Sequence, residues 1–151
     1  MELEKVIPTK IQIDILYGLL KYRKFSISHV NLPDYGHHKN FVLNHPYRGW
    51  FIIKDKSDVV GSVYLHYDNS IGLNFNRKLN KIELQSIIVE ISKKFEPLKG
   101  VPSVRNPNYF IKVASKNVKL QKTLIELGYR ETERVFLVKL IKKTKDLKCS
   151  K

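Results

Sequence analysis

The pattern of apolar residues predicts an α/β domain with a mixed central sheet and helices on both of its faces. Segments of helical period alternate with segments of strand period in the order β-α-α-β-β-β-α-β-α-β. The three strands in the middle follow one another through short turns, as in an antiparallel meander, and the later strands are separated by helices. A chain of 151 residues, of which 42% are hydrophobic, can bury the core of one such domain.

The first third of the chain is expected to contain one strand and two helices. Residues 4–7 form a short strand, and Thr9 then caps a helix that runs to about Arg23. A second helix begins after its N-cap, Asp34, and ends near residues 45–46. The apolar residues expected on the buried face of the first helix recur every four positions: Ile11, Ile15 and Leu19.

The middle third holds the meander, with strands at 50–53, 59–67 and 71–75. Asn80 follows as the cap of a long helix that reaches about Phe95. The strands have β-branched and aromatic residues, whereas the helix repeats its isoleucines at helical spacing.

The last third alternates again. A strand at 109–114 precedes a helix at 117–127, and Gly128 stands where a glycine commonly ends a helix. A final strand is expected at 135–138.

The chain is strongly basic, with a formal net charge of +14. The segment 141–151 has five lysines and one aspartate, so it carries +4 and leaves +10 on the body. We therefore expect one domain over residues 1–141 and a lysine-rich flexible tail over 142–151. Such a charge favours an anionic partner, including nucleic acid bound non-specifically through its phosphates, although a lysine-rich coding bias gives the same composition.

Other classes are excluded by what the sequence lacks. No apolar run approaches the about 18 residues of a membrane span, and residues 1–5 do not resemble a signal peptide, so we expect a cytoplasmic protein without a membrane partner. The one cysteine, Cys149, cannot form an internal disulfide or a cysteine-based zinc cluster. The five histidines show no zinc-ligand spacing, so we expect no metal: they are His29, His37, His38, His45 and His66.

Several segments together resemble the GNAT superfamily of N-acetyltransferases, and within it the branch of small enzymes that modify amino-sugar nucleotides. The resemblance covers roughly residues 28–140. It is carried by His45-Pro46-Tyr47-Arg48-Gly49-Trp50-Phe51, Gly61-Ser62-Val63-Tyr64, Asn69-Ser70-Ile71-Gly72, and Asn117 with Leu120 and Leu127-Gly128-Tyr129.

The resemblance implies that acetyl-CoA is the co-substrate. In this fold the fourth and fifth strands splay apart around the pantetheine arm, and backbone N–H groups of the fourth strand stabilise the oxyanion. The pyrophosphate lies at the start of the following helix. The residues implied to bind the cofactor are Leu73, Asn74, Phe75, Arg77, Lys78, Lys81 and Asn117.

The chain departs from the family pattern at three chemical positions. The glycine-rich phosphate loop is replaced by residues 76–83, which contain no glycine, so Arg77, Lys78 and Lys81 are expected to supply charge instead. Ser70 stands where the family has a glutamate, and Leu124 where it often has a tyrosine. The candidate catalytic residues are therefore Ser70 and His66, a histidine being able to act as a base near neutral pH.

The acceptor is expected to be a primary amine, and the branch resemblance suggests an amino-sugar nucleotide. Arg48 can bind a phosphate or a carboxylate, and Trp50 and Tyr64 can form the pocket wall, although both can also be core residues. The candidate substrate-binding residues are His45, Arg48, Trp50, Tyr64 and Asn69.

Three functions remain open from the sequence. The first is an N-acyltransferase that uses acetyl-CoA. The second is a member of the same fold that binds a ligand or partner without catalysis, which the three departures favour. The third is a basic nucleic-acid-binding module, which rests on the charge of +14 alone.

Overall fold

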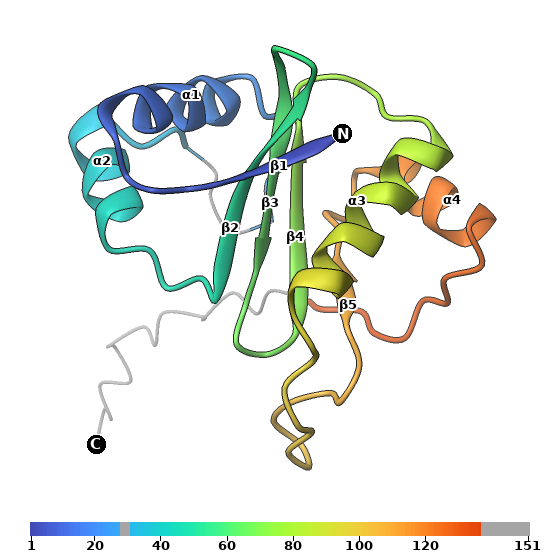
Figure 1. Ribbon diagram of the computed structural model, residues 1–151. Helices are drawn as coiled ribbons and strands as arrows, with labels where there is room; N and C mark the ends of the chain where they lie inside the picture. Colours follow the sequence, from blue (N-terminus) through green and yellow to red (C-terminus); the bar gives the residue numbers. More distant parts are fainter. Residues whose placement is uncertain (28–30, 137–151) are drawn as a thin grey trace, which may run out of the picture.

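The computed structural model describes residues 1–27 and 31–136. A five-stranded sheet with strand order β1-β2-β3-β4-β5 forms its centre (Figure 1). The strands are β1 Glu2–Lys5, β2 Gly49–Asp55, β3 Asp58–Leu65, β4 Ser70–Phe75 and β5 Phe110–Lys112. The helices are α1 Lys10–Lys21, α2 Tyr35–Leu43, α3 Lys81–Lys94 and α4 Val118–Glu126.

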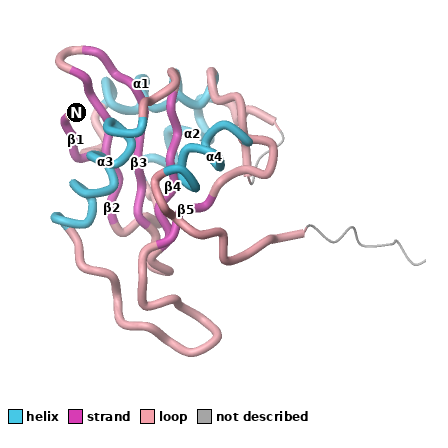
Figure 2. The backbone as a smooth tube through the Cα atoms, turned by 90° about the vertical axis from the view of Figure 1, so that its right-hand side faces the viewer, coloured by secondary structure: helices cyan, strands magenta, loops and turns pink. Residues whose placement is uncertain are grey.

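Helices cover both faces of the sheet, as the sequence predicts. α1 and α2 lie on one face, and α3 and α4 lie on the other (Figures 1 and 2). The core on the α1–α2 face is built from Val6, Ile13, Leu16, Leu19, Val42, Trp50 and Ile52. The core on the α3 face contains Phe51, Ile53, Val60, Val63, Leu65, Ile71, Leu79, Ile87 and Ile91.

The sheet is antiparallel from β1 to β4 and parallel only between β4 and β5. The parallel ladder is short and consists of Ser70 with Phe110, Ile71 with Ile111 and Gly72 with Lys112. β4 continues to Phe75, so its second half lies beyond the end of β5. The sheet is therefore mixed, as predicted, and it opens on one side of β4.

The four helix starts are the predicted ones because each has a side chain that accepts a backbone N–H. These N-caps are Thr9, Asp34, Asn80 and Asn117. Gly128 ends α4 with φ of +86°. Its N–H donates to Ile125 O at 2.9 Å and that of Tyr129 donates to Leu124 O at 3.0 Å, the paired bonds of a Schellman motif.

The predicted buried face of α1 is partly wrong. Ile11 is 72% exposed, whereas Ile13 and Leu16 are buried beside Leu19. Apolar residues occur around most of this helix, so more than one set has helical spacing and the spacing alone cannot choose between them.

Two predicted strands also differ. β1 begins and ends two residues earlier than predicted and pairs with Lys54 through Phe51. Of the predicted final strand at 135–138, Val135 and Phe136 lie in no strand and are exposed. Residues 137–138, like the predicted tail at 142–151, lie outside the described residues.

Gly72 allows the Tyr64 ring to lie across β4. A Cβ atom at position 72 would overlap that ring. We expect Gly72→Ala to lower the free energy of unfolding by about 1–3 kcal/mol, because the ring must move out of a packed position. Gly18→Ala in α1 is the matched control: its Cβ meets nothing, and it should stabilise the protein by up to about 1 kcal/mol. Urea denaturation of both variants makes the comparison, and equal stabilities would contradict this packing.

Candidate functional site

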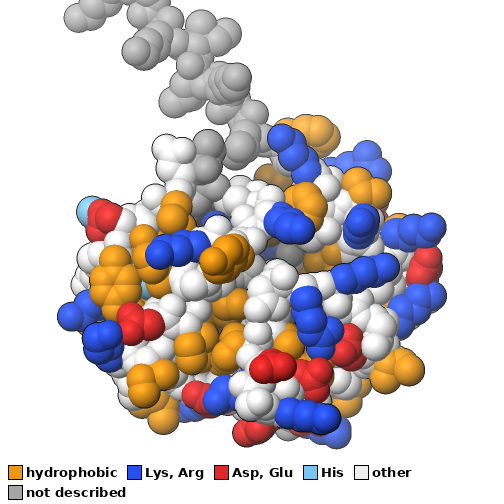
Figure 3. All heavy atoms as spheres, turned by 90° about the horizontal axis from the view of Figure 1, so that it is seen from above, with side chains coloured by type: hydrophobic (Ala, Val, Ile, Leu, Met, Phe, Trp, Pro, Cys, Tyr) orange, Lys and Arg blue, Asp and Glu red, His pale blue; other side chains and the backbone are white. Residues whose placement is uncertain are grey.

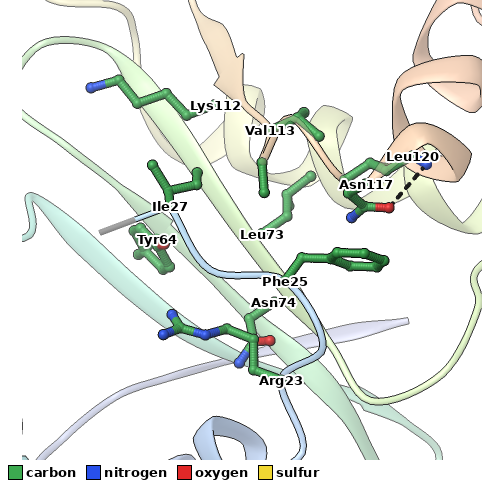
Figure 4. Close-up of a pocket in the computed structure, with 11 residues that line it drawn as sticks. Arg23, Phe25, Ile27, Tyr64, Leu73, Asn74, Lys112, Val113, Asn117 and Leu120 are labelled. Carbon is green, nitrogen blue, oxygen red and sulfur yellow. Dashed lines mark hydrogen bonds between the residues drawn. The ribbon is translucent and has the colours of Figure 1, made fainter. Parts of the chain in front are cut away.

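A cleft of about 60 Å³ lies where β4 and β5 separate. One wall comes from β4 and the other from the chain that follows β5. The loop after α1 and the start of α4 complete the cleft (Figure 4). The lining residues are Arg23, Phe25, Ile27, Tyr64, Leu73, Asn74, Lys112, Val113, Ala114, Asn117 and Leu120.

Hydrogen bonds to α4 hold the second wall away from β4. The carbonyl of Ala114 accepts from the Asn117 N–H at 2.8 Å and from Gln121 Nε2 at 3.1 Å. Gln121 Nε2 also donates to the Ser115 carbonyl at 3.0 Å. Because these carbonyls are bonded to α4, the chain after Lys112 has less need of β4 as a partner.

The exposed edge of β4 presents particular backbone groups to the cleft side. The carbonyl of Asn69 accepts from the Phe110 N–H, next to β5, whereas the carbonyl of Ser70 accepts from the His66 N–H, next to β3. Backbone N–H and C=O groups point to alternate sides along a strand, so those of the odd-numbered residues of β4 point toward β5. The last ladder pair is Gly72 with Lys112, and in a parallel pair Lys112 bonds to the C=O of Ile71 and the N–H of Leu73. The next N–H on that edge belongs to Phe75, whose side chain packs against the α3-side core.

Three of the residues implied to bind the cofactor line this cleft, Leu73, Asn74 and Asn117, and so does the candidate substrate-binding residue Tyr64. Asn74 Nδ2 donates to Leu19 O at 3.4 Å, so its side chain lies on the α1 face. Asn117 Oδ1 accepts from the Leu120 N–H at 3.3 Å (Figure 4). The residue of α4 that reaches the cleft is Leu120, whereas Leu124, one turn later, is buried.

The predicted phosphate-binding cations lie near the start of α3, but two of them are already paired. Arg77 Nη2 lies 3.0 Å from Glu83 Oε1 and 3.1 Å from Asp55 Oδ2. Lys81 Nζ lies 2.8 Å from Glu126 Oε2. Of the three, Lys78 makes no ion pair with a described residue.

The start of α3 also carries its own negative charge. Glu83 Oε2 accepts from the Asn80 N–H at 2.8 Å, and Asn80 Oδ1 accepts from the Glu83 N–H at 2.9 Å. The hydrogen bond from Arg77, and then that from the Asn80 backbone, lowers the pKa of Glu83. A phosphate at this helix start would therefore have to displace the Glu83 carboxylate.

Positive side chains are nonetheless numerous on this side of the molecule. Figure 3 shows Lys and Arg side chains gathered on the right of the view, the side on which α3 and α4 lie. Lys116 and Lys119 flank Asn117, are exposed, and make no ion pair with a described residue. The start of α4 thus combines a helix dipole with two unpaired cations.

An aromatic cluster lies beside the cleft, on the α1–α2 face of the sheet, and its centre is Tyr47. The Tyr47 ring stacks on Tyr64, with 4.4 Å between ring centroids. It meets Trp50 and His66 edge-on, at 5.1 and 5.0 Å. His45 stacks on Tyr47 at 5.6 Å, and Phe41 adds a further edge contact. Burial raises the pKa of Tyr47 and of Tyr64, so both phenols are neutral at physiological pH.

Tyr47 was not among the residues that the sequence singled out. It lies within the segment that carries the family resemblance, between His45 and Trp50, and that position was the available signal. The structure brings together four of the predicted residues around it: His45, Trp50, Tyr64 and His66.

His66 is a half-buried imidazole with rings on two sides. Burial lowers the pKa of His66. The negative charge of nearby Asp68 raises this pKa, and the positive charge of Lys112 lowers it further. The pKa of His45 is lowered by burial as well. Both imidazoles are therefore neutral at pH 7 and can accept a proton.

Ser70 lies at the closed end of the β4–β5 ladder and does not line the cleft. It is fully buried, and its Oγ makes no hydrogen bond within 3.5 Å to a described residue, although it is near Asp68. Asp68 accepts from the Ser70 N–H at 2.8 Å and from Lys112 Nζ at 2.7 Å. Burial opposes ionisation of Asp68, but these hydrogen bonds outweigh it and lower its pKa to about 2.

The structure places two predicted substrate-binding residues away from the cleft. Arg48 Nη1 donates to Glu96 O at 2.8 Å, and the guanidinium lies over the Phe95 ring, which packs against the α3-side core. Asn69 is fully buried. Its Nδ2 donates to Leu98 O and Asn106 O, and its Oδ1 accepts from the Leu98 N–H, all at 2.8 Å. These bonds hold the connection between α3 and β5, which is a structural task.

Neither a metal site nor a membrane span is found in the described part of the chain. Within residues 1–27 and 31–136, no three His, Cys, Asp or Glu side chains are grouped so that they could hold a metal ion. Over the same ranges no helix has the length and apolar character needed to cross a membrane. The cytoplasmic location remains a prediction.

Two solved acetyltransferases resemble this chain in fold. An acetyltransferase from Thermus thermophilus aligns with a TM-score of 0.57 and 17% identity, over 85% of this chain and 86% of that chain. A spermidine N-acetyltransferase from Vibrio cholerae, a dodecamer, aligns with a TM-score of 0.55 and 12% identity, over 87% of this chain and 80% of that one. No protein-family model and no curated protein matches the sequence. The architecture is the α/β fold of the GNAT acetyltransferases.

Proposed function

We propose that this protein is an N-acyltransferase that moves an acetyl group from acetyl-CoA to a primary amine. The observation that carries the proposal is the separation of β4 from β5 after three ladder pairs, with a cleft at that point. Two solved acetyltransferases share the fold, and the family resemblance implies that its fourth and fifth strands separate around the pantetheine arm. The cleft is lined by apolar Leu73, Val113 and Leu120, which suits the chain of a pantetheine arm.

The proposed reaction uses groups that lie next to residues of the cleft, on β4 and in the aromatic cluster. The amine nitrogen attacks the thioester carbonyl, a C–N bond forms, and the carbonyl oxygen becomes an oxyanion. The Phe75 N–H, on the edge of β4 beyond the ladder, can donate to that oxyanion. Collapse of the intermediate breaks the C–S bond and releases the thiolate of CoA. The proton lost by the amine passes to neutral His66, or to water, and then to the thiolate.

The phosphates of CoA have two basic regions available. Lys78 at the start of α3 and the pair Lys116 and Lys119 at the start of α4 are exposed. Arg77 and Lys81 can join only if they leave their carboxylate partners. The amino-sugar nucleotide suggested by the family resemblance fits an acceptor wall formed by Tyr64, because flat aromatic surfaces bind rings and nucleobases. Trp50 is buried and packs against Tyr47, which stacks on Tyr64.

A second candidate function is ligand binding without catalysis. It is favoured by the carboxylate of Glu83 at the start of α3 and by Ser70, which lies at the closed end of the β4–β5 ladder. The third possibility from the sequence, nucleic-acid binding, has no support beyond charge in the described residues, and we do not propose it.

Filling the cleft should abolish CoA binding. We expect acetyl-CoA to raise the melting temperature of the wild type, since a ligand that binds only the folded state stabilises it. Ala114→Phe should remove that shift by occupying the cleft. Ser115→Phe, an exposed neighbour that does not line the cleft, should keep it. Thermal shift measurements with both variants test this, and a shift that survives in Ala114→Phe would place CoA elsewhere.

Removing the candidate base should slow transfer and change its pH dependence. We expect His66→Ala to lower kcat by about 10²–10⁴-fold, and His37→Ala, an exposed histidine of α2, to leave it unchanged. The neutral imidazole is the active form and burial lowers its pKa, so the wild-type rate should fall only below about pH 6.5. Release of CoA, followed from about pH 5 to about pH 9, gives the profile. An acid limb that His66→Ala leaves unchanged would rule His66 out as the base.

A further inference from the structure

Arg23 is a cation of the cleft that the family resemblance does not include. It follows α1, lines the cleft, and is half-buried. Figure 4 shows its side chain extending from the loop toward Tyr64. Its positive charge acts on both Tyr47 and Tyr64, so it lies close to the aromatic cluster.

No carboxylate of the described chain neutralises Arg23. Its guanidinium donates to Ser26 Oγ at 3.3 Å, and no ion pair joins it to a described Asp or Glu. None of the described residues that line the cleft is acidic. The nearby carboxylate of Asp68 is already bonded to Lys112 and to the Ser70 N–H. The described part of the acceptor side therefore carries net positive charge.

A buried donor in the same region also lacks a partner. Trp50 is 7% exposed, and its Nε1–H makes no hydrogen bond to a described residue. An indole N–H can only donate, so a ligand that satisfies it must bring an acceptor atom. A buried donor without a partner costs free energy, and an acceptor atom supplied by a bound molecule would recover it.

We infer that the acceptor amine carries an anionic group, a carboxylate or a phosphate, and that Arg23 binds this group. The inference rests on the proposed transferase function and concerns the acceptor end of the same site. A guanidinium binds either oxyanion through two parallel hydrogen bonds, and the aromatic wall accommodates an apolar or ring-shaped spacer. A polyamine is a poor acceptor here, because its second ammonium group would approach Arg23 and Lys112 without a free carboxylate to bind. In its acceptor, this chain is therefore expected to differ from the Vibrio cholerae spermidine N-acetyltransferase that shares its fold.

A matched set of amines tests the inference. The four probes share an aminomethylphenyl frame and differ in the para group: a carboxylate, a phosphonate, a neutral carboxamide, or a second aminomethyl group. We expect kcat/KM for at least one anionic probe to exceed that of the diamine by about 10-fold or more, from the difference in charge. The carboxylate and phosphonate probes show which oxyanion is preferred.

Substitutions at Arg23 assign the effect to this residue. We expect Arg23→Gln to lower kcat/KM for the preferred anionic probe by about 10–100-fold and to change that of the carboxamide little. Arg23→Glu should make kcat/KM for the diamine higher than kcat/KM for the anionic probes. Lys24→Gln removes the neighbouring exposed cation, which does not line the cleft, and should leave every value unchanged. Melting temperatures confirm that each variant is folded.

Binding of each probe, measured by calorimetry in the presence of CoA, separates this inference from the transferase proposal. Transfer that is equal or faster with the diamine would overturn the inference and leave the transferase standing. Arg23-dependent binding of an anionic probe without transfer to any amine would support the anion site and contradict the transferase. Anionic probes that bind equally to wild type and Arg23→Gln would overturn the inference whatever the activity.

Discussion

The hydrogen bonds that tie the chain after β5 to α4 determine the rest of the site. Ala114 and Ser115 direct their carbonyls to Asn117 and Gln121, so β5 leaves β4 after three residues. The second half of β4 is then without a strand partner on one edge. A sheet edge without a partner strand leaves backbone groups unpaired, and here that edge becomes one wall of a cleft, with the Phe75 N–H on it. In the proposed reaction, the cofactor, the oxyanion and the acceptor are all placed relative to that edge.

The acceptor side depends on a second packing arrangement. The absence of a side chain at Gly72 lets Tyr64 lie across β4, and Tyr64 supports Tyr47, which holds His66 and Trp50 in place. The wall is therefore a stack of rings with few rotatable bonds, and the charge beside it comes from Arg23. Rigid aromatic surface loses little conformational entropy on binding, and in the proposed acceptor site the charge of Arg23 selects the anionic group.

The helices and the order of elements could be predicted from the sequence because their signals are local. Each of Thr9, Asp34, Asn80 and Asn117 caps a helix through a contact within three residues. The site was harder to predict because its residues meet through long-range packing. Tyr47, in the loop before β2, contacts Tyr64 of β3, and Arg23 reaches the cleft from a loop whose sequence shows no motif. Asn69, selected from a motif, holds the connection before β5 instead.

Amide chemical shifts measured by NMR show whether the edge of β4 beyond Gly72 receives the thioester. On titration with acetyl-CoA, we expect large shifts for the amides of Phe75 and Ala114. Smaller shifts are expected for Asn74, whose backbone faces β3. Shifts confined to residues 78–83 at the start of α3, with the Phe75 and Ala114 amides unmoved, would contradict the account.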